Sequence, residues 1–207
     1  MIHLGIIHAV HRVRPTIHQT IASLGLSGFP PPIVFADDGT HGAMGNAMRA
    51  LKALNRLAFH RDYVCVVDDD LVVCKPAMQL VQAAMASQPE ALTMYTVAQN
   101  LPHDQREGTG WISVKASEHL WGGMLLMRHD VARQVSEFLH YYLASNPGRF
   151  AKAPDAAFYH ALGSLGVDVL HHLPSLTQDI GDGASTIGNE HTPETKGFRW
   201  EEWNENL

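Results

Sequence analysis

The stretch that decides the fold is YVCVVDDDLVV at residues 63–73, an apolar run interrupted by three consecutive aspartates, Asp68, Asp69 and Asp70. The β-branched and aromatic residues before the acids are typical of a buried strand. Three carboxylates at the end of such a strand must meet water, a cation or hydrogen-bond donors, because unpaired buried charge is strongly unfavourable. A divalent metal ion meets this requirement well.

Strands and helices alternate on the N-terminal side of this stretch. Apolar runs predict strands over residues 2–10 and 32–36, a helix over residues 16–24, and an amphipathic helix that ends near residue 60. This spacing predicts a parallel sheet with helices on both faces, in which ligands bind at the carboxyl ends of the strands. Both acidic clusters, at residues 37–38 and 68–70, fall at such ends.

The C-terminal half continues the pattern. The expected helices cover residues 77–87, 130–144 and 154–165, and the expected strands cover residues 91–97, 167–171 and a pair near 111–114 and 122–127. Apolar content falls after residue 181. We therefore expect one domain over residues 1–188 and a tail over residues 189–207 that packs on or near the ligand site.

The composition limits the functional classes. The chain has 207 residues, of which 45 % are hydrophobic and 17 % charged, as expected for one globular domain. Its net charge of -6 disfavours general nucleic-acid binding. The first residues read directly as a strand, without the pattern of a secretory signal or a membrane-length apolar run, so we expect a cytoplasmic protein with no membrane span.

Several short motifs follow one another along residues 2–188. They are VFADD at 34–38, GN at 45–46, VVDDDL at 66–71, WGGMLL at 121–126, RHDVA at 128–132, PD at 154–155 and PSLTQ at 174–178. In this order they resemble the GT-A glycosyltransferases, a single-domain family that uses an Asp-x-Asp (DXD) motif. The resemblance implies a Rossmann-like α/β domain with a mostly parallel sheet. It also implies transfer of a sugar from a nucleotide-sugar, by preference a UDP-sugar, to an acceptor hydroxyl with Mn²⁺ or Mg²⁺.

Strand alternation puts Asp68 and Asp70 on one side of the chain and Asp69 on the other, so the outer pair can face one ligand. The resemblance implies that Asp70 binds the metal and that Asp68 binds the ribose, or the metal through water. Some relatives place a further histidine ligand just after the PSLTQ segment, where this chain has Asp179; His191 in the tail is another source. The alternative is that the aspartates only solvate a strand end or cap the next helix.

The resemblance also implies a set of donor-binding residues around the metal: Ala9, Val10, Arg14, Asp37, Asp38, Asn46, Asp68, Asp69, Trp121, Gly122 and Gly123. Each has a structural alternative. The Asp-Asp-Gly sequence at residues 37–39 is good turn chemistry, and Asn46 suits the N-cap of a helix. Arg14 could be a solvated arginine and Trp121 a core residue.

Transfer to a hydroxyl needs a group that removes its proton. In inverting relatives a carboxylate at the start of a late helix does this, and Asp155 stands at the matching place, with Glu118 as the competing carboxylate. The alternative for Asp155 is an acidic residue that the helix dipole favours in the first turn. Inversion is expected if Asp155 is the base, and retention if no carboxylate reaches the acceptor oxygen.

Other functions remain open at this point. A nucleotidyltransferase shares the strand order and the metal chemistry, but residues 9–13 lack the glycine-rich phosphate loop that it needs after the first strand. A metal-dependent phosphohydrolase and a non-catalytic nucleotide-sugar binding module are further alternatives. The acceptor is equally open: a glycan, lipid, protein, small molecule or modified nucleobase.

Overall fold

The computed structural model describes residues 1–10, 16–97, 101, 109–118 and 123–181. The helices of this part are α1 (Ile17–Leu26), α2 (Gly42–Leu57), α3 (Ala77–Met85), the 3-10 helix η3 (Ala116–Glu118), α4 (His129–Ser145) and α5 (Pro154–Ser164). The strands are β1 (Ile2–Ala9), β2 (Ile33–Asp37), β3 (Tyr63–Asp68), β4 (Leu71–Val73), β5 (Ala91–Thr93), β6 (Gly110–Lys115), β7 (Met124–Arg128), β8 (Asp168–Leu173) and β9 (Thr177–Asp179). This confirms the expected α/β class.

Seven strands form one mixed sheet in the order β2-β1-β3-β7-β5-β8-β6, while β4 and β9 form a separate two-stranded ribbon. Strands β2, β1, β3, β5 and β8 run parallel to one another; β7 lies antiparallel between β3 and β5, and β6 is antiparallel to β8. The expected pairing of the strands near 111–114 and 122–127 was wrong, because β6 and β7 lie apart in the sheet. The carboxyl ends of the five parallel strands therefore share one edge.

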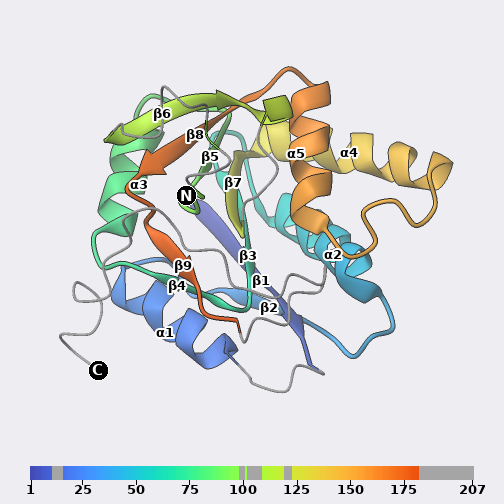
Figure 1. Ribbon diagram of the computed structural model, residues 1–207, viewed down its shortest axis with the longest axis horizontal. Coiled ribbons are helices and arrows are strands. Elements are labelled where there is room, and N and C mark those ends of the chain that lie inside the picture. The colour runs from blue at the N-terminus through green and yellow to red at the C-terminus, as the bar shows by residue number, and fades with distance from the viewer. Residues whose placement is uncertain (11–15, 98–100, 102–108, 119–122, 182–207) are drawn as a thin grey trace.

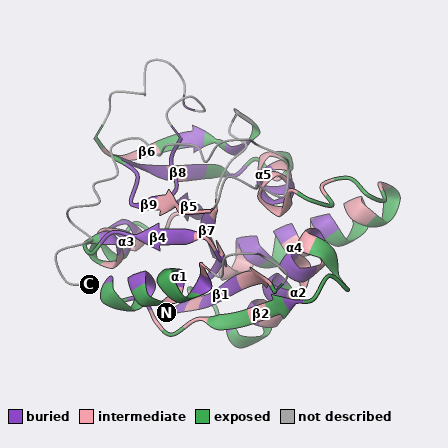
Figure 2. Ribbon diagram, turned by 60° about the horizontal axis from the view of Figure 1, so that its bottom comes forward, coloured by how far each residue is buried: buried purple, intermediate pink, exposed green. Residues whose placement is uncertain are grey.

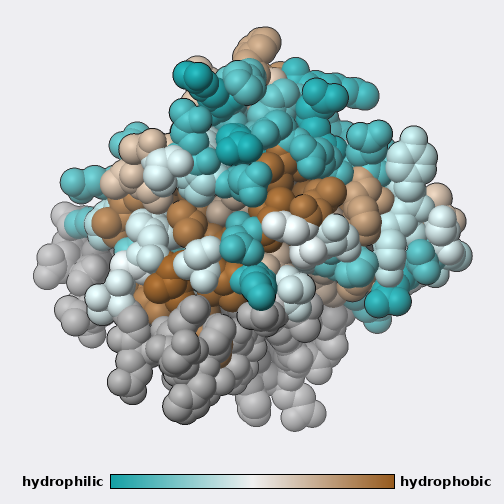
Figure 3. All heavy atoms as spheres, turned by 90° about the horizontal axis from the view of Figure 1, so that it is seen from above, coloured by the Kyte–Doolittle hydropathy of each residue, from teal (hydrophilic) through white to brown (hydrophobic). Residues whose placement is uncertain are grey.

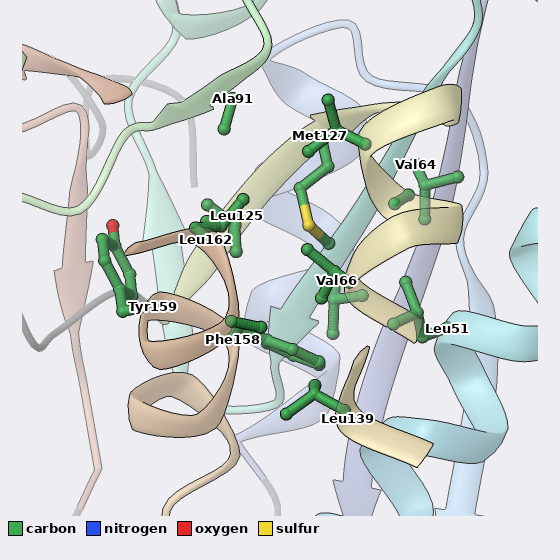
Figure 4. Close-up of a cluster of buried hydrophobic side chains, with 14 of the residues drawn as sticks. Leu51, Val64, Val66, Ala91, Leu125, Met127, Leu139, Phe158, Tyr159 and Leu162 are labelled. Atoms are coloured by element: carbon green, nitrogen blue, oxygen red, sulfur yellow. The ribbon is translucent and has the colours of Figure 1, made fainter. Parts of the chain in front are cut away.

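Helices cover both faces of the sheet and make two cores. On one face, α2, α4 and α5 bury side chains against β3 and β7, as Leu139, Phe158 and Leu162 do toward Val66 and Leu125 (Figure 4). On the other face, α1, α3 and the β4–β9 ribbon cover the opposite sides of the same strands. Figure 1 shows α2, α4 and α5 to the right of the sheet and the other group to its left.

Burial follows this layering. Figure 2 shows the central strands buried and the edge strand β2 largely exposed, because β2 has a neighbour on only one side among the described strands. Seen from above, hydrophobic side chains gather across the middle of the molecule, with hydrophilic ones along one rim (Figure 3). None of the helices in the described part of the chain is long and apolar enough to cross a membrane.

The acidic run makes a turn. Strand β3 ends at Asp68, and Asp69 and Asp70 form the turn into β4. The sequence predicted one strand that carries all three acids. The hydrophobic residues after the acids form β4 and pair with β9 outside the main sheet, which the sequence did not predict because three-residue strands show no periodicity.

Helix α2 begins earlier than expected. Its N-cap position is His41, so the predicted loop over residues 40–46 was wrong for most of its length. Asn46 lies within the helix and is not its N-cap. Its amide Nδ2 instead donates to the Phe35 carbonyl oxygen at 2.6 Å, and its Oδ1 accepts from Arg49 at 2.8 Å. The bond to Phe35 holds α2 against β2, and the bond from Arg49, also on α2, fixes the Asn46 side chain.

Asp62 ties together the opposite end of the sheet, where β1 and β3 begin. Its carboxylate accepts hydrogen bonds from the Phe59 N–H at 2.9 Å and the Met1 amine at 3.0 Å, and lies 2.9 Å from His3 Nε2. Burial raises the pKa of Asp62, but the hydrogen bonds of Phe59, His3 and the amine outweigh burial and hold the pKa well below its ordinary value.

We expect Asp62→Ala to lower the free energy of unfolding by about 1 kcal/mol near pH 7, a modest value because solvent screens the site. A carboxylate with a lowered folded-state pKa contributes stability above its unfolded pKa of about 3.9 and loses it as the pH falls through the folded value. The difference from the wild type should therefore shrink below about pH 4 in thermal unfolding. The exposed Glu137→Gln is the control; a difference that grows in acid would contradict this account.

Candidate active site

Acidic residues from four separate elements meet at the carboxyl edge of the sheet. Asp68 ends β3, Asp70 follows it in the turn, Asp179 ends β9 and Asp155 lies in the first turn of α5. Tyr95, two residues beyond β5, is 4 % exposed. Burial raises the pKa of the Tyr95 hydroxyl, and the negative charges of Asp179, Asp70, Asp68 and Asp155 raise it further. All four carboxylates thus lie on the side of the sheet that holds this phenol, which stays protonated.

The segment that holds Tyr95 is fixed to the chain just before Asp179. The Met94 carbonyl oxygen accepts from the Leu176 N–H at 2.9 Å and from the Ser175 hydroxyl at 3.0 Å. The Ser175 hydroxyl also accepts from the Thr96 N–H at 3.2 Å. These bonds connect the end of β5 to the start of β9, which explains how Tyr95 and Asp179 come to the same place.

Asp70 and Asp179 form a cradle around Gly181. The Asp70 carbonyl accepts from the Ile180 N–H at 2.7 Å, and the Asp179 Oδ1 accepts from the Gly181 N–H at 2.7 Å. A Cβ atom on Gly181 would lie 3.0 Å from Asp179 Oδ1 and 3.2 Å from Asp70 Oδ2. The two carboxylates therefore converge on a space that a side chain at position 181 would crowd.

This cradle fits a hard divalent cation. Carboxylate oxygens are the ligands that Mg²⁺ and Mn²⁺ prefer. Asp70, in the turn before β4, and Asp179, on the paired strand β9, supply two of them. Within the described ranges, no three His, Cys, Asp or Glu side chains converge closely enough to form a complete metal site. A cation held by this pair would complete its shell with water and ligand oxygens, as Mg²⁺ commonly does.

Asp68 borders the start of β7. Its N–H donates to the Gly123 carbonyl oxygen at 2.9 Å, and a Cβ atom on Gly123 would lie 3.3 Å from Asp68 Oδ2 and 2.8 Å from Leu71 Cδ1. Of the expected WGG segment, the structure thus places Gly123 beside the first aspartate. Some members of the predicted site lie outside the described residues. They are Arg14, Trp121, Gly122 and His191, together with the tail over residues 189–207.

The middle aspartate makes contacts that its neighbours do not share. Asp69 is 2 % exposed, and its Oδ2 lies 2.6 Å from His8 Nδ1 and accepts from the Ala9 N–H at 3.1 Å. Strand alternation predicted only that Asp69 faces away from its neighbours, toward backbone or solvent. In the turn that the structure shows, its carboxylate contacts β1. The N-cap residue of α3 is Pro76, which makes no side-chain capping hydrogen bond, and a capping role for the aspartates stays a prediction.

The two acids at the end of β2 stabilise the turn that leads into α2. Asp37 Oδ1 accepts from the His41 N–H at 3.0 Å and lies 3.2 Å from His41 Nδ1; the backbone bond is the main cause of its lowered pKa. Asp38 accepts from the hydroxyl and the N–H of Thr40, and these bonds lower its pKa. The expected turn chemistry is therefore present. Roles for both acids in nucleotide binding stay predictions.

The main chain of Ala9 and Val10 was expected to line a base pocket. Both residues do lie at the carboxyl end of β1, beside Asp37 of β2. Their N–H groups bond within the protein, Ala9 to Asp69 and Val10 to the Asp37 carbonyl oxygen at 3.0 Å. A nucleotide would therefore meet their carbonyl oxygens or side chains.

Asp155 and Glu118 do not occupy equivalent places. Asp155 lies one helical turn before Tyr159, whose pKa is raised by burial and also by the charge of Asp155. The backbone of η3, which ends at Glu118, packs against the far end of α5, where a Cβ atom on Gly163 would lie 3.0 Å from the Ser117 nitrogen. A helix rises about 1.5 Å per residue, so this end is about 12 Å from Asp155 along the helix axis.

Three residues of this site had no place in the sequence interpretation: Tyr95, Gly181 and His8. The signal for His8 was weak, because it is one of 14 histidines without a metal-ligand spacing. Tyr95 lies in a segment that the sequence predicted as strand interior. Gly181 stands two residues after Asp179, and only the fold reveals that its missing side chain leaves a cradle.

No protein-family model matches the sequence, and no curated protein matches it either. Solved structures do resemble it. A197 from STIV has 16 % identity and a TM-score of 0.56 over 96 % of this chain and 100 % of its own. A putative glucose-1-phosphate thymidylyltransferase from Bacillus anthracis, in complex with sucrose, has 11 % identity and a TM-score of 0.51 over 92 % of this chain and 94 % of its own.

A mutant of a Drosophila β1,4-galactosyltransferase 7, in complex with manganese, UDP-Gal and xylobiose, has 13 % identity and a TM-score of 0.47 over 99 % of this chain and 80 % of its own. At such identities a likeness shows the fold alone. The single α/β domain is consistent with a GT-A-like Rossmann fold, in agreement with the fold class expected from the sequence.

We expect Gly181→Ala to weaken Mn²⁺ binding roughly tenfold or more, because the added methyl group must push the two carboxylates apart. Isothermal titration with MnCl₂ measures this. Gly25→Ala is the matched control, since a Cβ atom there meets nothing within 4 Å. An unchanged Mn²⁺ affinity in Gly181→Ala would show that the cradle does not hold the cation.

Proposed function

We propose that the protein is a metal-dependent glycosyltransferase that moves a sugar from a nucleoside-diphosphate sugar, by preference a UDP-sugar, to an acceptor hydroxyl. The observation that carries this proposal is the placement of Asp68, Asp70, Asp155 and Asp179 at the carboxyl edge of the sheet, where Asp70 and Asp179 converge at Gly181. Ligands of open α/β sheets bind at this edge. The similarity of the fold to that of a nucleotidyltransferase supports a ligand built from a nucleotide and a sugar.

Asp70 and Asp179 would hold Mn²⁺ or Mg²⁺ in this proposal. When bound, the ion supplies Lewis-acid stabilisation of the charge that develops on the diphosphate leaving group. Asp68 would bind the ribose, or the ion through water. Tyr95 stays protonated, so it adds no charge to this acidic edge.

Asp155 would act as the general base of an inverting transfer. Its carboxylate takes the proton of the acceptor hydroxyl, the acceptor oxygen bonds to the anomeric carbon, and the bond from that carbon to the diphosphate breaks with its electron pair. The first turn of α5 suits this role, because it presents Asp155 at the edge where the other acids meet. The substrate on this side would carry the hydroxyl, from a glycan, lipid, protein, small molecule or modified nucleobase.

The second candidate is a nucleotidyltransferase, which the structural likeness to the thymidylyltransferase favours. It would join a nucleoside triphosphate to a sugar phosphate and release pyrophosphate at the same acidic edge. Against it, residues 9–13, which follow or end the first strand, contain no glycine to cradle a triphosphate.

The test is incubation with a panel of nucleotide-sugars and MnCl₂, with chromatography of the products. Slow release of nucleoside diphosphate and free sugar supports the transferase. Pyrophosphate release from a nucleoside triphosphate and a sugar 1-phosphate supports the second candidate. Release of inorganic phosphate alone would indicate a phosphohydrolase, and binding without turnover a binding module.

We expect Asp70→Ala to abolish Mn²⁺-dependent binding of UDP, because it removes one wall of the cradle. Thermal shift measures this, since a ligand that binds only the folded state raises the melting temperature. The matched control is Asp168→Ala, which removes an exposed acid from the start of β8. Equal Mn²⁺-dependent shifts in the wild type and Asp70→Ala would refute the metal assignment.

We expect Asp155→Asn to lower kcat by about 10²–10⁴-fold with little change in UDP affinity, because general-base catalysis contributes about this much. Steady-state kinetics with the best donor and acceptor, together with UDP titration, separate the two effects. Glu118→Gln tests the competing carboxylate in the same assay. A larger loss in Glu118→Gln than in Asp155→Asn would exchange their roles.

A further inference from the structure

Asp69 sits between the acids that the proposed function assigns to the donor and the metal, yet its own carboxylate is directed into the protein. The side chain is only 3 % exposed. One oxygen, Oδ2, serves both contacts to β1: it lies 2.6 Å from His8 Nδ1 and 3.1 Å from the Ala9 nitrogen. The middle acid therefore ties the β3–β4 turn to the carboxyl end of β1.

The backbone of Asp69 is held as firmly as its side chain. Its carbonyl oxygen accepts two hydrogen bonds, both at 2.9 Å, from the hydroxyl of Thr16, the N-cap residue of α1, and from the hydroxyl of Thr20 within α1. Thr20 is 0 % exposed, so water does not compete for this bond. Asp69 thus joins three elements: the turn itself, β1 through its carboxylate and α1 through its carbonyl.

These contacts fix the direction of the neighbouring side chains. Asp68 and Asp70 carry like charges and repel each other, so an unrestrained turn would let them rotate apart. Four hydrogen bonds to the residue between them restrict the backbone dihedrals on which both side chains depend. Partners that orient metal ligands in this way commonly contribute 10–100-fold to metal affinity.

We propose that Asp69 is a positioning residue, which holds the acidic turn in the conformation that presents Asp70 to a cation and Asp68 to the donor. Its hydrogen-bond-accepting oxygen, and not its charge, is what this role needs. The proposal rests on the proposed function, because it assumes that the acids bind a cation. It differs from the sequence-based expectation that Asp69 itself belongs to the donor-binding residues.

The decisive comparison is Asp69→Asn with Asp69→Ala. Asparagine offers one oxygen of the same geometry to His8 and Ala9 but no charge, whereas alanine offers none. We expect Asp69→Asn to bind Mn²⁺ within about threefold of the wild type and Asp69→Ala to bind it about tenfold or more weakly. Electron paramagnetic resonance of free Mn²⁺, titrated in the presence of UDP, measures the affinity without any turnover.

A second pair of variants isolates the contact from α1. Thr20→Val removes the hydroxyl that donates to Asp69 while keeping the size of the side chain. The matched control is Ser23→Ala, since Ser23 is also 0 % exposed on α1 and its hydroxyl accepts from the Val73 N–H of β4 at 3.2 Å. We expect weaker Mn²⁺ binding in Thr20→Val than in Ser23→Ala, even though both lose a buried hydrogen bond.

The outcomes separate this proposal from the proposed function. Wild-type protein that binds no Mn²⁺ with UDP would overturn both. If the wild type binds Mn²⁺ and Asp69→Asn binds it as weakly as Asp69→Ala, the positioning role is overturned. The charge of the Asp69 carboxylate would then be what Mn²⁺ binding needs. Equal affinities in the wild type and Asp69→Ala would also overturn it. If Asp69→Ala does not fold, the Mn²⁺ affinity of Asp69→Asn and the comparison of Thr20→Val with Ser23→Ala still test the positioning role.

Discussion

Repulsion between carboxylates is the constraint on which the rest of this structure depends. Asp68, Asp70, Asp155 and Asp179 all act on the buried hydroxyl of Tyr95, so the fold gathers negative charge where water is partly excluded. Such an arrangement is unfavourable unless donors or a cation offset it. The Gly181 N–H supplies part of this compensation to Asp179, and the proposed cation would supply more where Asp70 and Asp179 converge.

Most strands of the sheet could be predicted from the sequence, because the hydrophobic patterns that indicate them lie within short segments of the chain. The apolar runs that form β1, β2 and β3, and the amphipathic helices between them, repeat with the periods of strands and helices. The position of the acids at a strand end followed from the same pattern. The edge of the sheet that holds the candidate site was therefore predictable from residues that are close together in the chain.

Contacts between distant segments were the part that the sequence could not predict. Strand β7 lies between β3 and β5, antiparallel to both, although it follows them in the chain, and nothing in its composition specifies that place. Asn46 was expected at a helix start, but it lies within α2, and its side chain donates a hydrogen bond to the Phe35 carbonyl oxygen of β2. The directions of Asp69 and Tyr95 likewise depend on partners that come from other elements, so they become visible only in three dimensions.

The β4–β9 ribbon has a consequence for how the protein is made. Asp70 emerges early during synthesis, whereas Asp179 is added near the end, and the two meet only after the late strand pairs with β4. Closing so long a loop has an entropic cost that local contacts do not offset. The cradle of Asp70 and Asp179 would thus be among the last parts to assemble on a nascent chain, and the proposed cation would favour the completed fold.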